Sequence, residues 1–421
     1  AALLSSLATF GAGFAVRPFG AAVFGRIGDI IGRKFTFLVT ITVLGVWTAL
    51  VGILPTYAQI GILAPIILVV LRLAQGLALG GEYGGAATYV AEHAPDHARG
   101  KYTSWIQTTA TVGLLLALAV ILIFRLGMGD AAFREYGWRI PFILSAALVV
   151  LALFIRLRLQ ETPLFSRLKA EGRSTSSPWR ESFGDPKNRR LILLALFGMT
   201  AGQAVVWYQG QFQALFFMQN ILGVKFSTTY LIVGTAIVLA TPFFIFFGRL
   251  SDRVGRKPII LAGCLVAALT YYPIYNLMFT AANPVPNPKT DPAITSTFIS
   301  SNPNLVALIA LVWIQVVFVT MVYGPIAAFL VEFFPARIRY TSLSIPYHIG
   351  NGWFGGFLPL IAASLFAATG NIYAGLIYPI VVALLTAAIG WRYVRETKDV
   401  RIWDEVGGQT ENVPKATSPV T

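Results

Sequence analysis

A ten-residue segment occurs twice in this chain of 421 residues. The first copy, GRIGDIIGRK, occupies residues 25–34, and the second, GRLSDRVGRK, occupies residues 248–257. Each copy lies between two long apolar stretches. A charged, glycine-containing segment that returns half a chain later indicates an internal duplication, and duplicated halves are a common architecture of membrane proteins.

The composition is that of a membrane protein. Mean hydropathy is +0.70, 56% of the residues are hydrophobic and only 12% are charged, far from the soluble average. Apolar runs long enough to cross about 30 Å of hydrocarbon predict spans at 3–24, 35–54, 62–91, 101–124, 139–158, 191–218, 228–248, 258–280, 304–331, 341–367 and 372–394.

The net charge of +14 follows membrane topology and does not indicate a nucleic-acid partner. With 25–34 placed in the cytoplasm, 25 of the 32 Lys and Arg residues fall on the cytoplasmic side, as the positive-inside rule requires. We therefore expect a multi-pass protein of the cell membrane that contacts membrane lipids, with its linker and C-terminus in the cytoplasm.

Further repeats define the expected domains. The pattern E-x-x-P-x-x-x-R at 92–99 returns at 332–339, and the pair ET at 161–162 returns at 396–397. We predict an N-terminal bundle at 1–158, a cytoplasmic linker at 159–189, a C-terminal bundle at 190–395 and a tail at 396–421. The first half shows five spans and the second six, so we expect a first helix to be missing from this chain.

Two polar segments are predicted to lack regular structure. Residues 281–302 are rich in Pro and Asn, which predicts an irregular external loop. The tail from about residue 396 is polar and is predicted to be disordered.

The duplicated segment carries an aspartate at the same place in both copies. Asp29 and Asp252 stand near span ends among Arg and Lys, where paired charges can latch neighbouring helices on one side of the membrane. Topology alone would need only the basic residues. The residues predicted to act in gating are Gly25, Asp29, Gly32, Arg33, Gly248, Asp252, Gly255, Arg256, Glu92, Arg99, Glu332 and Arg339.

Three ionisable residues of the first half break the symmetry. Arg17, Arg72 and Glu82 fall within predicted spans, and the matching regions of the second half are apolar. Charged groups at bilayer depth are costly unless they face a cavity or a partner. We therefore expect them to belong to a functional site, with Glu82 as a proton carrier or as half of a structural ion pair with Arg17 or Arg72.

Helix periodicity arranges the polar residues of span 62–91. Arg72 and Tyr83 are predicted to share a face, and so are Gln75 and Glu82, so that a polar stripe runs down this span toward the cytoplasm. The glycines at 76, 80 and 84 form a smooth ridge that favours close helix packing.

The second half supplies amides and aromatic rings in its spans instead of charges. His348 lies within a span and is either a packed, neutral side chain or a proton carrier. The residues predicted to contact substrate are Arg72, Arg17, Gln75, Tyr83, Gln203, Trp207, Gln211, Tyr347 and Asn351.

These motifs carry a family resemblance. The repeated G-R-x-x-D-x-x-G-R-K resembles the signature of the major facilitator superfamily. The segments RPFG at 17–20, RLAQG at 72–76, GGEYG at 80–84, WRIPF at 138–142 and ETPLF at 161–165 resemble its metabolite:proton symporter family, which includes carriers of citrate, 2-oxoglutarate, shikimate, proline and betaine.

The resemblance implies an all-α transmembrane fold of two six-helix bundles that alternates access to drive proton-coupled uptake. The chain departs from the family pattern in lacking the first helix and in having Ile30 where the first signature usually has Arg. The proton site of that first helix therefore cannot be assigned here.

We expect a symporter for a small organic acid, with Arg72 as the preferred carboxylate ligand and Arg17 as the second choice. One alternative is a betaine or proline carrier that surrounds a quaternary ammonium with Trp207, Tyr208 and Trp353. Another is a membrane receptor on a transporter scaffold. We expect no enzyme activity, because hydrolase motifs such as GxSxG and HExxH are absent, no metal or other cofactor, and a monomer.

Overall fold

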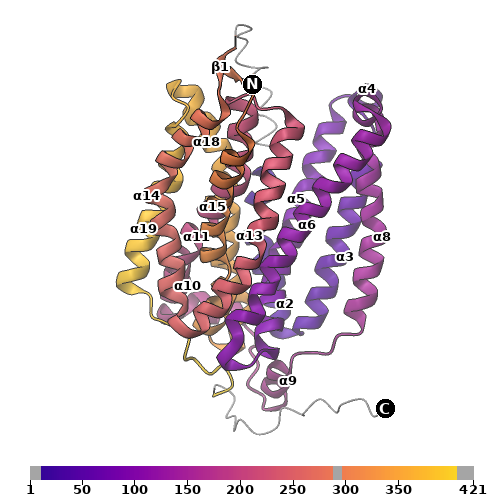
Figure 1. The fold of residues 1–421 in the computed structure, drawn as a ribbon. Coiled ribbons are helices and arrows are strands. Elements are labelled where there is room, and N and C mark those ends of the chain that lie inside the picture. The colour runs from indigo at the N-terminus through magenta and orange to yellow at the C-terminus, as the bar shows by residue number, and fades with distance from the viewer. Residues whose placement is uncertain (1–10, 288–295, 405–421) are drawn as a thin grey trace, which may run out of the picture.

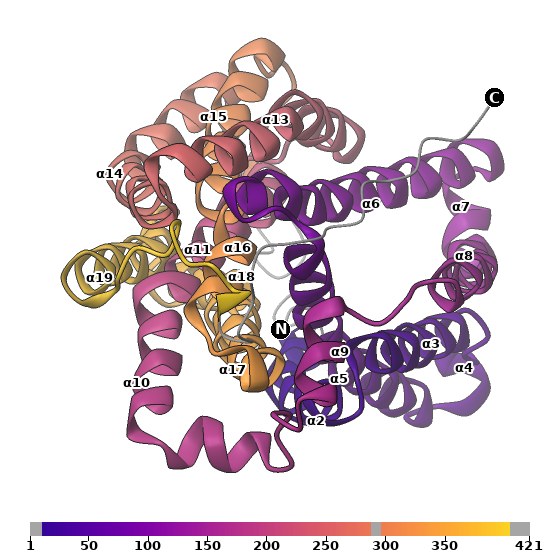
Figure 2. The same cartoon turned by 90° about the horizontal axis from the view of Figure 1, so that it is seen from below.

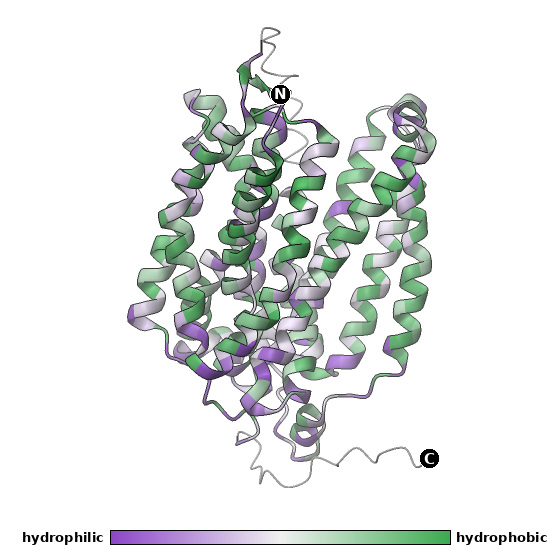
Figure 3. Ribbon diagram, viewed as in Figure 1, coloured by the Kyte–Doolittle hydropathy of each residue, from purple (hydrophilic) through white to green (hydrophobic). Residues whose placement is uncertain are grey.

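A computed structural model describes residues 11–287 and 296–404 as a bundle of roughly parallel helices (Figure 1). Within these ranges, ten helices are long and apolar enough to cross a membrane. Apolar residues cover the helix shafts, and hydrophilic residues gather at the lower ends and connections, where α9 lies (Figure 3). The all-helical, multi-span prediction is confirmed.

The first group of helices occupies one side of the molecule. Its elements are α2 (Arg17–Ile30), α3 (Arg33–Gly52), α4 (Tyr57–Ile60), α5 (Leu63–His93), α6 (Arg99–Met128), α7 (Asp130–Ala132) and α8 (Arg139–Leu157). The lower connection to the second group contains α9 (Pro163–Ala170).

The second group begins with one long helix, α10 to α12, interrupted by wider π-type turns. Its elements are α10 (Pro186–Ala195), α11 (Ala201–Tyr208), α12 (Ala214–Phe216), α13 (Phe226–Val254), α14 (Arg256–Ala282), α15 (Leu305–Tyr323), α16 (Ile326–Phe333), α17 (Arg339–Ile349), α18 (Leu358–Thr369) and α19 (Ile377–Tyr393).

Most of the repeated segment is helical. Its first copy forms the last turns of α2 and its second copy forms the last turns of α13. The helix is interrupted at Gly32 in the first copy and at Gly255 in the second. The φ angles of these glycines, 144° and 119°, disfavour any residue with a side chain. The predicted spans correspond to the observed helices, although the start of span 3–24 lies outside the described residues.

The two groups meet along two helix pairs. α2 packs against α17, and α6 packs against α13, so that each pair joins one helix from each half. The view from below shows both pairs at the junction between the groups (Figure 2). Within the first group, α5 packs against both α2 and α3.

The glycine ridge of α5 brings its neighbours to backbone contact. A Cβ atom at Gly76 would lie 1.9 Å from the backbone oxygen of Gly13, and one at Gly80 would lie 2.3 Å from that of Arg17. One at Gly84 would lie 1.9 Å from the hydroxyl of Ser344 on α17. The ridge therefore sets the distance from α5 to both halves of the junction.

Two predictions of irregular structure were wrong for part of their residues. Within the 281–302 segment, β1 (Val285–Pro286) and β2 (Phe298–Ile299) pair as an antiparallel ribbon, because the apolar residues at its two ends can align. In the tail, Thr397 and Ile402 are fully buried. Its first residues pack under the helices, whereas the predicted disorder of 405–421 lies outside the described residues.

We predict that Gly76→Ala destabilises the protein by about 1–3 kcal/mol, because the new methyl group overlaps backbone atoms that cannot rotate away. The control is Gly234→Ala in α13, where no atom lies within 4 Å of the position that a Cβ atom would take; this change should be neutral or slightly stabilising. Thermal unfolding in detergent measures both. Equal unfolding temperatures for the two variants would contradict the close approach.

Candidate functional site: a charged junction and a half-buried arginine

The carboxylate of Asp29, in the last turn of α2, accepts two backbone hydrogen bonds from the other half. The N–H of Tyr340 donates at 3.2 Å and the N–H of Thr341 at 2.9 Å. Both donors lie in the first turn of α17, where amide groups lack partners within the helix. A carboxylate at this position satisfies them and complements the helix dipole.

Asp252, the repeated partner of Asp29, makes the matching contact in the opposite direction. It lies at the end of α13 and accepts hydrogen bonds from the N–H groups of Gly100 at 2.8 Å and Lys101 at 2.9 Å. These donors form the first turn of α6. Each half thus caps a helix of the other half, and both caps lie at the lower end of the junction.

Buried arginines and glutamates extend this junction. Glu332 pairs with Arg99 at 2.8 Å and with Arg256 at 3.0 Å, and it also accepts a hydrogen bond from Thr397 at 2.8 Å. Arg339 pairs with Glu92 at 3.3 Å. These charges are buried, so removing one partner would leave the other uncompensated.

A second pair of glutamates supports the helices that follow the glycine breaks. Glu161 accepts hydrogen bonds from the N–H groups of Arg33 and Lys34 at 3.1 and 3.2 Å. Glu396 accepts from those of Arg256 and Lys257 at 2.9 and 3.0 Å. The repeated ET pairs therefore cap α3 and α14.

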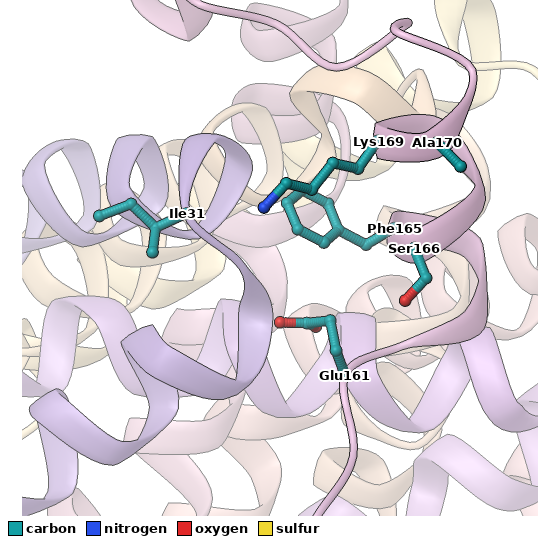
Figure 4. Close-up of a pocket in the computed structure, with 6 residues that line it drawn as sticks. All are labelled: Ile31, Glu161, Phe165, Ser166, Lys169 and Ala170. Carbon is teal, nitrogen blue, oxygen red and sulfur yellow. The ribbon is translucent and has the colours of Figure 1, made fainter.

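An open surface pocket lies where α9 meets the first glycine break (Figure 4). Glu161 and Lys169 extend toward the same space, and Phe165 lies between α9 and α2. The lining residues are Ile31, Glu161, Phe165, Ser166, Lys169 and Ala170. Because it lies at the lower surface beside the capping contacts, we assign it to the junction and not to substrate binding.

The structure brings the predicted gating residues together at this junction. Gly25 approaches α17 and Gly248 approaches α6 so closely that a Cβ atom would meet Thr341 at 2.8 Å and Ser104 at 2.6 Å. Arg33 donates to the backbone oxygen of Ala336, in the other half, at 3.1 Å. The gating role itself remains a prediction.

Arg17 lies higher in the bundle, where both halves contribute side chains. Its guanidinium carbon is 3.9 Å from the ring centre of Phe14. Phe14 in turn packs edge-on against Tyr208 of the second half, with ring centres 5.6 Å apart, and the Cβ atom of Arg17 lies 3.8 Å from the position that a Cβ atom at Gly352 would take. Among the described residues, no carboxylate pairs with Arg17, and its buried Nε atom has no hydrogen-bond partner.

Local sequence explains why Arg17 can reach this position. The helical residues 11–15 and α2 are separated by a turn at Val16, and Pro18 follows at the start of α2. Proline lacks an N–H group and interrupts helical hydrogen bonding. The N–H of Phe19 donates to the carbonyl of Val16 at 3.1 Å and not to that of Ala15. The Ala15 carbonyl instead accepts from the indole N–H of Trp353 at 3.0 Å.

A stack of two tyrosines crosses the junction between the halves. The rings of Tyr83 and Tyr347 are parallel within 1°, with centres 3.5 Å apart. The amide of Gln107 donates to the Tyr83 hydroxyl at 2.8 Å, and the hydroxyls of Tyr347 and Tyr323 are hydrogen-bonded to each other. This row of side chains, Gln107–Tyr83–Tyr347–Tyr323, therefore links α6 and α5 of the first half with α17 and α15 of the second.

The remaining second-half candidates lie around this row of side chains. Gln203 and Asn351 exchange two hydrogen bonds, at 3.1 and 3.2 Å. Trp207 packs against Tyr208 and Tyr323. In the described part of the chain, neither the buried Gln211 amide nor either ring nitrogen of His348 has a hydrogen-bond partner. Gln211 and Asn351 lie in π-type turns, which are frequent at functional sites.

The predicted ion-pair partners of Glu82 were wrong. It pairs with Arg156 and accepts a hydrogen bond from Thr40 at 2.9 Å, and neither Arg17 nor Arg72 is its partner. Arg156 is the second-last residue of α8, and Thr40 lies two turns into α3. Glu82 therefore lies near the end of α8 and the start of α3. Helical periodicity along α5 could not reveal its partner, because the arginine comes from α8.

Two other candidates lie apart from the aromatic cluster. Arg72 donates to Gln75 at 3.4 Å, and Gln75 donates to Thr48 of α3 at 3.1 Å, so these contacts stay within the first half. Trp353 is 42% exposed and does not join Trp207 in a cage. Arg17 thus lies between the halves and Arg72 within the first one, and the role of either arginine in binding a carboxylate stays a prediction.

Sequence reasoning missed Tyr323, Gln107 and Arg156. Gln107 is an amide within an apolar run, and this signal could have identified it. Tyr323 precedes a Gly-Pro pair where α15 gives way to α16. A tyrosine does not stand out in a membrane span without knowledge of its neighbours.

Comparison with known proteins agrees with this architecture. Residues 1–286 match the Major Facilitator Superfamily. The inner membrane metabolite transport protein YhjE of Escherichia coli K12 is 33% identical over 379 residues, which cover 87% of this chain and 78% of that protein. The chain belongs to the Major Facilitator Superfamily.

Other relatives carry more specific names. The alpha-ketoglutarate permease of Escherichia coli K12 is 34% identical over 364 residues, covering 86% of this chain and 78% of that protein. The proline/betaine transporter of Salmonella typhimurium LT2 is 30% identical over 402 residues, covering 92% and 74%. These relatives are members of the metabolite:proton symporter family, and the chain is a multi-pass secondary transporter of metabolites and not an enzyme.

A solved structure shows the same fold. The proton:xylose symporter XylE bound to 6-bromo-6-deoxy-D-glucose superposes with a TM-score of 0.73, covering 96% of this chain and 89% of that one. Sequence identity is 20%, so this likeness concerns the fold alone.

We predict that Asp29→Ala and Asp252→Ala each loosen the cytoplasmic junction. Loss of a helix cap costs about 1 kcal/mol, which shifts an opening equilibrium roughly fivefold. The probe is Ser344→Cys, buried between α17 and α5, in a Cys264→Ala background. The rate of its alkylation from the cytoplasmic side should rise about fivefold.

The control is Asp399→Ala, whose side chain is 87% exposed and whose loss should leave the alkylation rate unchanged. Unchanged rates in the Asp29 and Asp252 variants would contradict the latch.

Proposed function

We propose that this protein is a proton-coupled symporter that imports a small organic acid by alternating access. The observation that carries the proposal is Arg17, a half-buried cation between the two halves with no carboxylate partner among the described residues. An arginine at bilayer depth is stable when it faces a ligand or a partner. Its planar guanidinium can hold a carboxylate through two hydrogen bonds.

The names of the relatives support a carboxylate ligand. Alpha-ketoglutarate is a dicarboxylate, and proline and glycine betaine are zwitterions that also carry a carboxylate. A carboxylate-binding arginine therefore serves every one of these compounds. The rest of the pocket would then decide which carboxylate is accepted.

The proposed movement uses the duplicated halves as two rigid bodies, at 1–158 and 190–395. The capping contacts of Asp29 and Asp252 hold the cytoplasmic ends together. The Tyr83–Tyr347 stack joins α5 to α17, and we propose that it closes the inner side of the substrate site. Parting of the halves at this end would separate the stack and the caps together and release the substrate inward.

Proton coupling is assigned to His348. Its ring packs edge-on against Tyr347, with centres 5.1 Å apart, and neither ring nitrogen has a hydrogen-bond partner among the described residues. A protonated imidazole would repel the Arg17 guanidinium, and a carboxylate bound between them would offset this repulsion. Substrate and proton would therefore each favour the binding of the other. Glu82 is the second candidate for the proton site, and it already forms an ion pair with Arg156.

A second function is a betaine or proline carrier. Its support is the aromatic cluster of Trp207, Tyr208, Phe212 and Tyr323, whose rings lie within 6.2 Å of Trp207. Such rings can bind a quaternary ammonium by cation–π contact. The carboxylate of the same ligand would still require Arg17.

We predict that carboxylates stabilise the purified protein against heat and that Arg17→Gln abolishes this effect. A ligand at about a hundred times its Kd adds roughly 2.7 kcal/mol. The panel contains 2-oxoglutarate, glycine betaine, proline and the uncharged amides of the acids. Arg72→Gln is the matched control, because it removes the same charge from a residue whose contacts stay within one half.

Stabilisation of Arg17→Gln by the acids would overturn the carboxylate site. Response to betaine alone, lost in Trp207→Ala, would favour the second function.

We predict that His348→Gln uncouples transport from protons. In proteoliposomes, an inward proton gradient should accelerate uptake by the unmodified protein and leave the rate of the variant unchanged. Carboxylate ligands should still stabilise the variant against heat. Glu82→Gln is the comparison. Loss of gradient-driven uptake in Glu82→Gln, with coupling intact in His348→Gln, would move the proton site to Glu82.

A further inference from the structure

The cytoplasmic connection contains a short helical segment at 178–184, directly before α10. It runs along the rim of the molecule between α9 and the start of α10, when seen from below (Figure 2). The indole N–H of Trp179 donates to the carbonyl of Ala22 in α2 at 2.8 Å. This contact fixes the segment at the level where α2 leaves the membrane and α10 enters it.

The outer face of this segment is apolar and aromatic. Trp179 and Phe183 are each 42% exposed, although both are large hydrophobic side chains. They are four residues apart and so lie on the same side of a helical turn. Tryptophan and phenylalanine in such positions are typical of helices that lie in the membrane interface.

Five basic residues stand on this segment, on the start of α10 and on the adjoining part of α2. All five are exposed, and none forms a salt bridge with a described residue; they are Arg26, Arg180, Lys187, Arg189 and Arg190. The guanidinium of Arg26 lies 5.6 Å from the ring centre of Trp179, so the charge from α2 adjoins the aromatic face.

The acidic residues of the segment do not cancel this charge. Glu181 is paired with Arg337 at 2.6 Å, and Asp185 caps the N–H of Lys187 at 2.8 Å. Asp185 is exposed and is the one carboxylate of 178–190 without a cationic partner. The patch therefore keeps a net positive charge facing the level of the lipid headgroups.

We propose that residues 178–190, together with Arg26, form a binding surface for the headgroups of anionic phospholipids in the cytoplasmic leaflet. The aromatic rings set the depth of the segment and the basic side chains select the headgroup charge, each contributing electrostatic attraction close to the surface. This goes beyond the proposed transport activity and does not depend on it.

This lipid-binding surface contacts α17 and the residues directly before it. The hydroxyls of Ser182 and Ser342 are 2.9 Å apart, and Glu181 holds Arg337, directly before α17. Ser342 follows Tyr340 and Thr341, the residues that Asp29 caps. A headgroup on this surface is thus bound next to the latch.

The test places a single fluorophore at Gly184→Cys in the Cys264→Ala background. A side chain fits at this position, where the nearest atom lies 3.7 Å from the Cβ site. The protein is reconstituted in phosphatidylcholine with a minor fraction of phosphatidylglycerol, with bromine on the chains of one lipid or the other. Quenching by brominated phosphatidylglycerol should exceed its mole fraction at least about twofold.

Two controls define the outcome. The first is a triple variant of the surface, Arg180→Gln with Lys187→Gln and Arg190→Gln, in which quenching should fall to the mole fraction. The second removes equal charge elsewhere, by Arg249→Gln with Arg392→Gln and Arg401→Gln, and should preserve the excess. High salt should reduce the excess without any substitution. Quenching in proportion to mole fraction in the unmodified protein, or an excess that survives the first triple change, would overturn the proposal.

Discussion

The exchange of helix caps between the two halves is the interaction on which the closed cytoplasmic side depends. Asp29 caps α17 and Asp252 caps α6, so each half satisfies amide groups that the other half leaves unpaired. A helix start has no internal partner for its first N–H groups. The junction is therefore strong when assembled, yet water can replace its contacts when the halves part, as a gate requires.

Around these caps, the buried ion pairs make the closed arrangement specific. Glu332 holds Arg99 from the opposite half and Arg256 from its own half, so it links the inter-domain contact to the glycine break that precedes α14. The same break positions the backbone that Glu396 caps. A displacement at one of these groups leaves a buried charge without its partner, which favours a switch between two discrete states over gradual deformation.

The internal repeat made the junction predictable. Aspartates, glycines and glutamates at matching positions in two copies signalled a shared structural role, and the structure brings these residues together. The interior was less accessible. Glu82 and Gln75 were placed correctly on one face, toward α3, but the depth of Glu82 and its pairing with Arg156 depend on where α8 ends. Helical periodicity gives the direction of a side chain and not the identity of the helix that it meets.

The sequence by itself determined a multi-span helical protein with two related halves, its orientation signals and the location of its charged junction. These follow from hydrophobic length, charge asymmetry and duplication, which are local or repeated properties of the chain. Only the tertiary structure decided that Arg17, and not Arg72, lies against the second half, beside Phe14, Tyr208 and Gly352. That choice depends on how two halves pack across the glycine ridge of α5 and the break before Pro18, and such long-range contacts have no repeated pattern in the chain.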